Sequence, residues 1–262
     1  MNDYLKREIM EQSRHQFIYG YDNLDRSNFI KSLEFSYPIK VNYDIPMAIY
    51  MENYFLPDIN NINNDVDKFT LMMINREYFN IAIVVNIVKK ILNEKGLNLE
   101  CSDVSDFLKQ IRFISIDESS FTSLDDLLIE LNISLEFYLL YFNCLLEGKS
   151  NLPNINDIKI PFVMSDMVVP KIKKLLNNNS YFGIIIDNKD NLSLNMIKAI
   201  NSYISRRING DLSMKVVCEP SEWLTYYDTN GMLVEATHDY GDVYLDNSFS
   251  NYTKSLIKKR LC

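Results

Sequence analysis

The stretch GYDNLDRS, residues 20–27, decides how the rest of the chain is interpreted. A short apolar run, Phe17-Ile18-Tyr19, precedes it, and a helix-like segment from Asn28 to Phe35 follows it. The order of these segments predicts a strand that leads through a polar connection into a helix.

Phosphate-binding P-loops occupy this context and read G-x-x-x-x-G-K-[ST]. The spacing is kept here, but Asp25 stands in place of the second glycine and Arg26 in place of the lysine. A carboxylate at Asp25 adds bulk and negative charge beside an anion. The guanidinium of Arg26 is broader than the compact ammonium that reaches the β- and γ-phosphates. We therefore expect this version of the loop to repel phosphate.

Ser27 still supplies the hydroxyl that would hold Mg²⁺ in a P-loop. A plainer interpretation is also open, in which an ordinary strand–turn–helix connection is capped by Asp22, Asn23 and Asp25. The stretch by itself defines candidate cofactor ligands without establishing a cofactor site.

Composition predicts a folded protein with few loops. Of 262 residues, 47% are hydrophobic, which is enough apolar material for a sizeable core. Only seven are glycine and seven proline, which argues against a loop-rich or disordered protein. The N-terminus is charged rather than signal-like, and no apolar run approaches the roughly 20 residues needed to span a bilayer. We expect a soluble, cytoplasmic protein without a membrane segment.

The net charge of −8 weighs against broad adhesion to nucleic acid, since that adhesion depends on lysine and arginine neutralising phosphates. A basic cluster near the C-terminus, formed by Lys254, Lys258, Lys259 and Arg260, leaves open a local contact with nucleic acid or an acidic partner. The four cysteines form no C-x-x-C pair and have no nearby histidine, so a zinc site is not expected.

Alternating strand-like and helix-like segments predict an α/β protein with a parallel, P-loop NTPase-like sheet. Strand-like segments are 16–19, 38–43, 181–187, 214–218 and 243–245. From about residue 48 to 176 the pattern is helical, with candidate helices at 69–92, 103–113, 123–146 and 158–176 and a capping box formed by Ser123 and Asp126. We divide the chain into a first core part, 1–47, a helical insertion, 48–176, and a second core part, 177–262.

The run Ile184-Ile185-Ile186-Asp187 is an apolar strand that ends in an acid, at the edge where open α/β sheets bind ligands. In P-loop NTPases this is the position of the Walker B acid, which holds the metal. The next residue is Asn188, whose amide can orient a water molecule but cannot take its proton. A second candidate, Phe113 to Glu118, ends in Asp117-Glu118, but helical segments flank it, so the order of elements favours Asp187.

Two further polar groups have competing interpretations. Arg206 and Arg207 could serve as an arginine finger, or they could simply favour the dipole at the end of a helix. The run His238-Asp239-Tyr240 suggests catalysis, yet no serine or cysteine stands in a recognisable nucleophile elbow. A turn before the strand at Val243 is the better prediction for that run.

Taken in order, these segments resemble the bacterial and archaeal AAA ATPases related to the origin-recognition and replication-initiator proteins. The matching segments lie towards both ends of the chain, at 17–27, 184–187, 214–217, 231–235, 238–240, 243–245 and 256–261. The resemblance implies a nucleotide-binding core that is often coupled to DNA or to partner subunits. The chain departs from the family at Asp25, Arg26 and Asn188, which affect nucleotide binding and hydrolysis most.

We therefore expect no catalytic residue, and ATP with Mg²⁺ bound weakly or not at all. The candidate cofactor-binding residues are Gly20, Asp25, Arg26, Ser27, Asp187 and Asn188, with Ser27 and Asp187 as metal ligands only if Mg-nucleotide binds.

The leading hypothesis is a hydrolysis-deficient, AAA-like protein that acts as an interaction or regulatory module with a protein partner or a second copy. The alternative is an ATP-binding switch, or a weak ATPase, that works in an oligomer or on DNA. The helical insertion departs from the family and is the expected partner surface.

Overall fold

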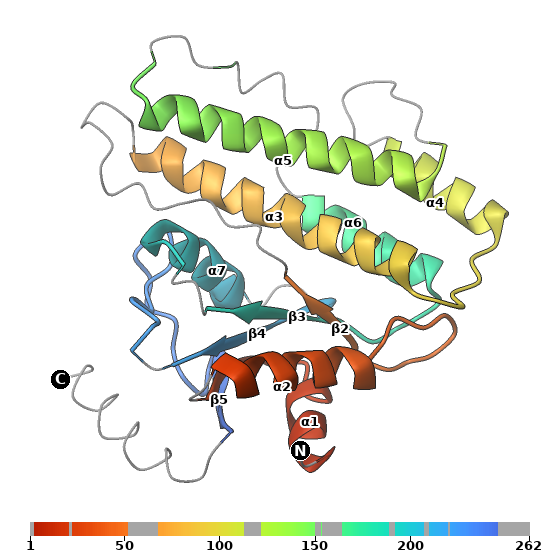
Figure 1. Cartoon of the computed structure of the whole chain (residues 1–262), viewed down its shortest axis with the longest axis horizontal. Coiled ribbons are helices and arrows are strands. Elements are labelled where there is room, and N and C mark those ends of the chain that lie inside the picture. The colour runs from red at the N-terminus through yellow and green to blue at the C-terminus, as the bar shows by residue number, and fades with distance from the viewer. Residues whose placement is uncertain are drawn as a thin grey trace.

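The computed structural model describes residues 3–20, 23–51, 68–112, 122–149, 153, 164–188, 192–206, 210–219 and 221–245. Within these ranges the chain forms a five-stranded, wholly parallel sheet with helices on both faces (Figure 1). The expected α/β fold class is therefore confirmed. The helices are α1 (Asp3–Met10), α2 (Asn23–Ser36), α3 (Lys68–Asn93), α4 (Cys101–Arg112), α5 (Leu124–Leu146), α6 (Met164–Leu175) and α7 (Leu194–Arg206).

The strands of the sheet lie in the order β2-β3-β4-β1-β5. Their bounds are β1 (His15–Tyr19), β2 (Met47–Tyr50), β3 (Phe182–Asp187), β4 (Leu212–Cys218) and β5 (Tyr240–Tyr244). Because β4 lies between β1 and β3, the carboxyl ends of these three strands are neighbours. The polar residues predicted at the ends of β1 and β3 are thus brought to one edge of the sheet.

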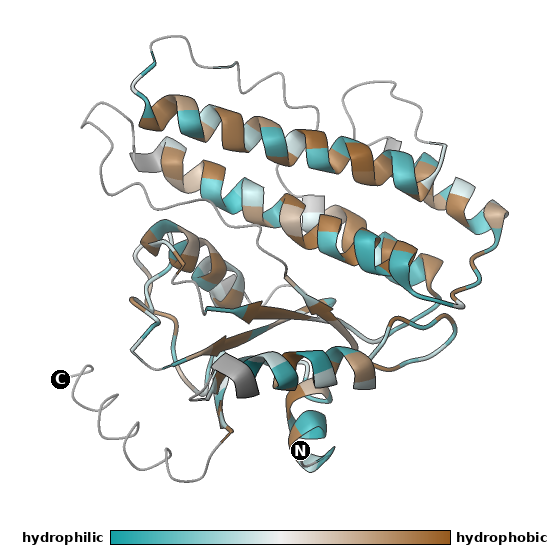
Figure 2. Ribbon diagram, in the orientation of Figure 1, coloured by the Kyte–Doolittle hydropathy of each residue, from teal (hydrophilic) through white to brown (hydrophobic). Residues whose placement is uncertain are grey.

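The sheet separates two apolar cores, because successive side chains of a strand point to opposite faces. Ile18 of β1 packs with α1 and α2, against residues such as Met10 and Leu33. Its neighbours Phe17 and Tyr19 belong to the larger core under the helical layer. All residues of β3 and β4 are buried, and Figure 2 shows hydrophobic colouring along the strands, as expected for a parallel sheet covered on both faces.

The helical layer consists of α3, α4, α5 and α6, and α3 is its central helix (Figure 1). Four consecutive turns of α3 are almost wholly buried, and α5 packs on the side of α3 away from the sheet. The predicted capping box begins α5: the Asp126 amide donates to Ser123 Oγ at 3.1 Å, and the Ser123 amide donates to Asp126 Oδ2 at 3.0 Å. The predicted helices of this layer are confirmed where the structure describes them.

Two of these helices are long and apolar enough to cross a membrane by length and composition alone, Thr70–Asn93 within α3 and the whole of α5. The sequence pattern predicted no apolar segment of this length, so that prediction underestimated both helices. In α3, 83% of the most apolar window is buried inside the protein, as in the core helix of a soluble domain. In α5 the buried share is only 39%, so part of its apolar surface faces outward.

Two predictions about local structure are wrong. Residues 38–43 do not form a strand, because Asn42 adopts a positive φ of 60° and its amide bonds to the Leu176 carbonyl. The second strand is β2, which starts after Pro46 and crosses the expected boundary between 47 and 48. Helix α2 begins at Asn23 rather than Asn28. Glycine disfavours a helix, and the residues between Gly20 and the end of α2 include none, so the helix can start earlier than expected.

A partly buried histidine, His15, is the first residue of β1. The Met214 amide of β4 donates to His15 Nδ1 at 2.9 Å, which requires a neutral imidazole with its proton on Nε2. Burial, assisted by the charge of Lys215 and opposed by that of Asp239, lowers the pKa of His15 to about 4. The folded protein therefore resists protonation of this side chain in mildly acid solution.

We expect this histidine to make the protein less stable as the pH falls from 7 to 5. Below pH 6.5 the unfolded chain binds a proton that the folded chain does not bind until about pH 4, so unfolding is favoured by roughly 2 kcal/mol at pH 5. His15→Asn keeps an acceptor and should lose this part of the pH dependence, measured by urea unfolding at both pH values. His238→Asn, which changes the exposed histidine, is the control and should behave like the parent.

Candidate functional site

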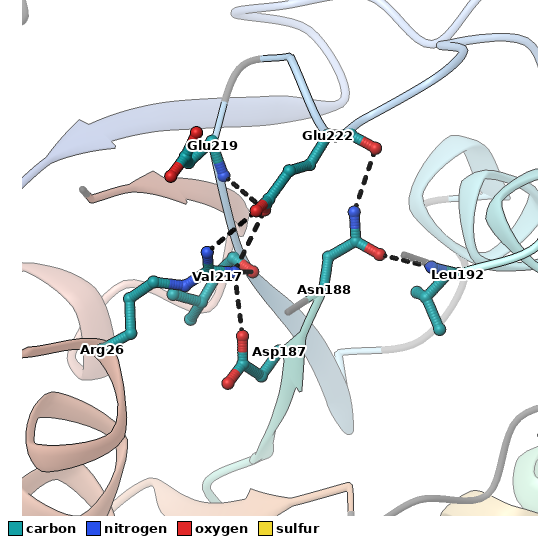
Figure 3. Close-up of polar contacts among 7 residues, drawn as sticks. All are labelled: Arg26, Asp187, Asn188, Leu192, Val217, Glu219 and Glu222. Atoms are coloured by element: carbon teal, nitrogen blue, oxygen red, sulfur yellow. Dashed lines mark hydrogen bonds and ion pairs between the residues drawn. The ribbon is translucent and has the colours of Figure 1, made fainter. Parts of the chain in front are cut away.

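Arg26 lies at the carboxyl edge of the sheet, in the first turn of α2, with only 1% of its surface exposed. Its Nη2 atom donates to Asp187 Oδ1 at 2.9 Å and to the Val217 carbonyl at 3.2 Å (Figure 3). The guanidinium therefore joins the helix after β1 to the ends of β3 and β4. The predicted lysine equivalent and the predicted Walker B acid form an ion pair with each other.

A second carboxylate, Glu222, completes the cluster. Its two oxygens accept hydrogen bonds from Arg26 Nη1 at 3.2 Å and from Arg26 Nη2 at 3.1 Å. Such a paired arrangement matches the fork geometry of a guanidinium to a carboxylate. Among the described side chains, one formal positive charge thus faces two formal negative charges, those of Asp187 and Glu222.

The loop that carries Glu222 is held in place by its own hydrogen bonds. The Glu219 amide donates to Glu222 Oε2 at 2.7 Å, which closes the turn after β4. Asn188 Nδ2 donates to the Glu222 carbonyl at 3.0 Å, and Asn188 Oδ1 accepts from the Leu192 amide at 2.8 Å (Figure 3). Asn188 is fully buried, so its amide connects two loops instead of facing a reacting water molecule.

The charge of Arg26 is secured by its partners. Burial lowers the pKa of Arg26, but the hydrogen bond to Glu222 and the charge of Asp187 outweigh this effect and raise the pKa above its ordinary value. Within the described part of the chain, Arg26 Nε is buried without a hydrogen-bond partner. An unpaired buried donor costs about 1–3 kcal/mol, so the two carboxylates must offset this cost as well as the desolvation of the guanidinium.

The remaining predicted cofactor residues are placed as follows. Gly20 is not among the glycines with positive φ, and a Cβ there would approach Leu245 Cδ1 to 2.7 Å, so this glycine accommodates packing at the end of β5. Ser27 is half-buried and follows Arg26 in the first turn of α2. Asp25 lies in the same turn, and its side chain is outside the described part. Arg26, Asp187 and Asn188 are the predicted residues that the fold brings together.

These residues do not fit a bound Mg-nucleotide. The carboxylate of Asp187 that would hold the metal is paired with Arg26, and the carboxylate of Glu222 would repel a polyphosphate. Residues 23–27 are helical, so the connection from β1 to α2 is only Gly20 to Asp22, which is much shorter than the predicted eight-residue frame. Among the described residues, no group of three or more His, Cys, Asp or Glu side chains is arranged to hold a metal ion.

Several other predictions concern residues that the structure does not describe. These are Asp117 and Glu118, the side chains of Arg206 and Arg207, and the basic cluster from Lys254 to Arg260. The residues before β5 are described, and His238 and Asp239 lie in a turn in which Asp239 Oδ2 accepts from the Glu235 amide at 2.8 Å. The prediction of a turn is confirmed for His238 and Asp239, whereas Tyr240 is already the first residue of β5, which begins three residues before Val243.

Sequence reasoning missed Glu222 and the residues that anchor its loop. Trp223, fully buried, donates from Nε1 to Asn201 Oδ1 at 3.3 Å, and Asn201 Nδ2 donates to the carbonyls of Thr225 and Tyr227. The only signal in the sequence was position, because Glu222 closely follows a buried strand. That signal becomes useful once β4 is known to lie beside β3.

Comparisons with known proteins place the chain beside one family. A family model described as ORC-CDC6-like matches residues 48–262, which is most of the chain and begins after the segment that contains Arg26. No curated protein and no solved structure matches the chain.

The buried charge cluster predicts a clear pattern of stability changes. Arg26→Met leaves Asp187 and Glu222 without their cation and should lower the free energy of unfolding by about 3–5 kcal/mol. The triple change Arg26→Met, Asp187→Asn, Glu222→Gln removes all three charges and should recover most of that loss. Urea unfolding measures both variants.

An exposed ion pair supplies the control for this experiment. Lys109→Met removes the pair with Asp106, whose side chains are both mostly exposed, and should change the free energy of unfolding by less than about 1 kcal/mol. An Arg26→Met variant as stable as the parent would contradict the structural role assigned to the cluster.

Proposed function

Because the chain belongs to the ORC-CDC6-like family, we propose that it is an AAA-like protein that has lost ATP hydrolysis and acts as an interaction or regulatory module. Membership confirms the relation to the origin-recognition and replication-initiator proteins that the sequence indicated. The proposal adds that the protein works without a nucleotide cycle, in the cytoplasm, and through contact with a protein partner.

The observation that supports this proposal is the ion pair between Arg26 and Asp187. In a P-loop NTPase the positive residue of the loop contacts phosphate and the acid at the end of the neighbouring strand holds the metal. Here each group satisfies the other at 2.9 Å, and both are almost fully buried. A nucleotide would have to break this pair and also approach the carboxylate of Glu222.

The position after the acid supports the loss of hydrolysis. Asn188 cannot remove a proton from water, and both ends of its amide are bonded to the loops on either side. Even a nucleotide that reached this edge of the sheet would meet no general base at that position.

The alternative, an ATP-operated switch, requires Arg26 to leave Asp187 when nucleotide arrives. Such a switch predicts that Mg-ATP stabilises the folded protein, because a ligand that binds only the folded state must raise its melting temperature. Binding at a hundred times the Kd corresponds to about 2.7 kcal/mol, which is easily measured.

We expect 5 mM Mg-ATP, on the order of a hundredfold above the Kd of a moderate binder, to leave the melting temperature of the parent unchanged. We also expect turnover far below the roughly 1 per second of ordinary enzymes. The variant Asp25→Gly, Arg26→Lys, Glu222→Gln introduces the glycine and lysine of the P-loop pattern and removes the carboxylate of Glu222 while keeping Asp187, so it should gain measurable affinity in calorimetric titration. It should not gain hydrolysis, because Asn188 is unchanged.

The same titration decides between the two functions. A parent protein that binds Mg-ATP and melts at a higher temperature would support the switch and overturn the proposal. A folded triple variant that binds no better than the parent would mean that this edge of the sheet was never a phosphate site, and the family relation would then concern the fold alone. The double change Asp103→Asn, Asp106→Asn at exposed positions of α4 also raises the net charge by two, so it controls for effects of net charge.

A further inference from the structure

The outward side of α5 carries large apolar side chains that nothing in the described part of the protein covers. Ile129, Ile133 and Leu140 are 57%, 52% and 53% exposed, and Leu139 beside them is 37% exposed. We call these four residues, together with Glu136 among them, the α5 face. Figure 1 places α5 at the outer edge of the helical layer, on the side of α3 away from the sheet, so the α5 face is accessible to another molecule.

The spacing of the α5 face suits a helical partner. Positions 129, 133 and 140 are four and seven residues apart, so their side chains form one stripe along the helix. A helix of 23 residues is about 34 Å long, which gives several turns of contact to a partner helix laid along it. Single exposed apolar residues are common on protein surfaces, but several isoleucine and leucine side chains along one side of a helix indicate a binding surface.

The charges of α5 and of the segments next to it in the sequence have one sign. Between Arg112 and Lys149 the sequence contains no lysine or arginine and seven acidic residues. The exposed acids nearest the stripe are Asp125, Glu136 and Glu147. A surface of this kind attracts cations and repels anions over distances of about a Debye length.

We propose that the α5 face binds a cationic amphipathic helix of a partner protein, with leucine-like side chains packed on the apolar stripe and lysine or arginine paired with the flanking acids. This inference rests on the proposed function, since it names the partner chemistry of the interaction module. It requires no nucleotide and involves no residue of the Arg26 cluster.

A second copy of the chain fits this surface poorly. Pairing two α5 faces around a twofold axis would bring Asp125, Glu136 and Glu147 of one copy against the same acids of the other. Like charges placed opposite one another at an interface cost several kcal/mol. A partner of opposite charge gains from the same acids.

An anionic membrane fits poorly for the same reason. The α5 helix passes the length and composition test for a membrane span, but its outward side contains Glu136 and Asn143, and its other side packs on α3. Helices that lie on membranes have lysine and arginine on the polar face, which attract the anionic lipids. The α5 helix contains neither residue type.

The experiment uses the full chain and a fluorescent 18-residue peptide of leucine and lysine arranged as an amphipathic helix. Its control is a peptide of the same composition in scrambled order. Fluorescence anisotropy should show at least about tenfold tighter binding of the amphipathic peptide, a difference of about 1.4 kcal/mol.

The triple change Ile129→Ser, Ile133→Ser, Leu140→Ser should reduce that binding about tenfold or more. The matched control is Phe35→Ser on α2, which removes an apolar side chain that is 88% exposed and should leave binding unchanged.

A charge variant keeps the test decisive if the triple variant does not fold. Glu136→Lys changes one exposed side chain and should weaken peptide binding at low salt, with the difference shrinking as salt rises. Melting temperatures verify that each variant is folded.

Each contrary result has a definite meaning. Equal binding of both peptides, or unchanged binding after the triple change, would overturn the proposal. The proposal would also be overturned if the parent were a dimer that the triple change dissociates, because the occupant would then be a second copy. Binding of the parent to phosphatidylserine vesicles that is lost in the triple variant would overturn it as well. The peptide experiment and the Mg-ATP experiment change different residues. Failure of one proposal can therefore be distinguished from failure of the other.

Discussion

The ion pair between Arg26 and Asp187 is the constraint on which the carboxyl edge of the sheet depends. A single buried guanidinium connects helix α2, the end of β3, the carbonyl of Val217 and the loop that carries Glu222. A buried charge is tolerated only when it is paired and hydrogen-bonded. The same bonds that make the charge tolerable also occupy the acid that holds a metal in a P-loop NTPase, so the stability of this edge and the proposed loss of nucleotide binding would have one cause.

Helix α7 links this edge to the helical layer. Towards the loop after β4, Asn201 bonds the carbonyls of Thr225 and Tyr227. Towards the helical layer, the Tyr203 hydroxyl lies 2.6 Å from Ser165 Oγ, which in turn donates to Asn80 of α3 at 2.8 Å. Polar contacts of this kind are directional, whereas apolar packing is not. The helical layer is therefore fixed on the sheet in one orientation, and its outer helix is presented in a defined direction.

The distribution of charge matches this arrangement. Residues 113–148, which include α5, and residues 216–253, which include the Glu222 loop and β5, each contain seven acids and no lysine or arginine. Both regions repel phosphate and attract cations. Nucleotide and duplex DNA are polyanions, so this distribution of charge along the sequence agrees with the proposed contact with a basic protein partner. The net charge of −8 alone would not reveal this, because basic residues elsewhere in the chain partly mask it.

The sequence by itself determined what depends on near neighbours along the chain. The capping box joins residues three positions apart, Ser123 and Asp126, and β1, β3 and β4 each contain a short run of apolar residues, so patterns of a few residues predicted them correctly. The position of β2 was missed because an initial proline, two β-branched residues and a tyrosine made 38–43 look like a strand, although a positive φ at Asn42 turns the chain there.

Only the tertiary structure decided what the candidate site is. Arg26 and Asp187 were both singled out from the sequence, but as separate ligands of a nucleotide, and their partnership spans 161 residues. Glu222, 196 residues from Arg26, was not identified. Whether these charges meet depends on β4 lying between β1 and β3 and on the turn after β4, because a pairwise Coulomb interaction acts through space. Local sequence patterns predict the strands, but they do not determine which strand ends become neighbours in the sheet.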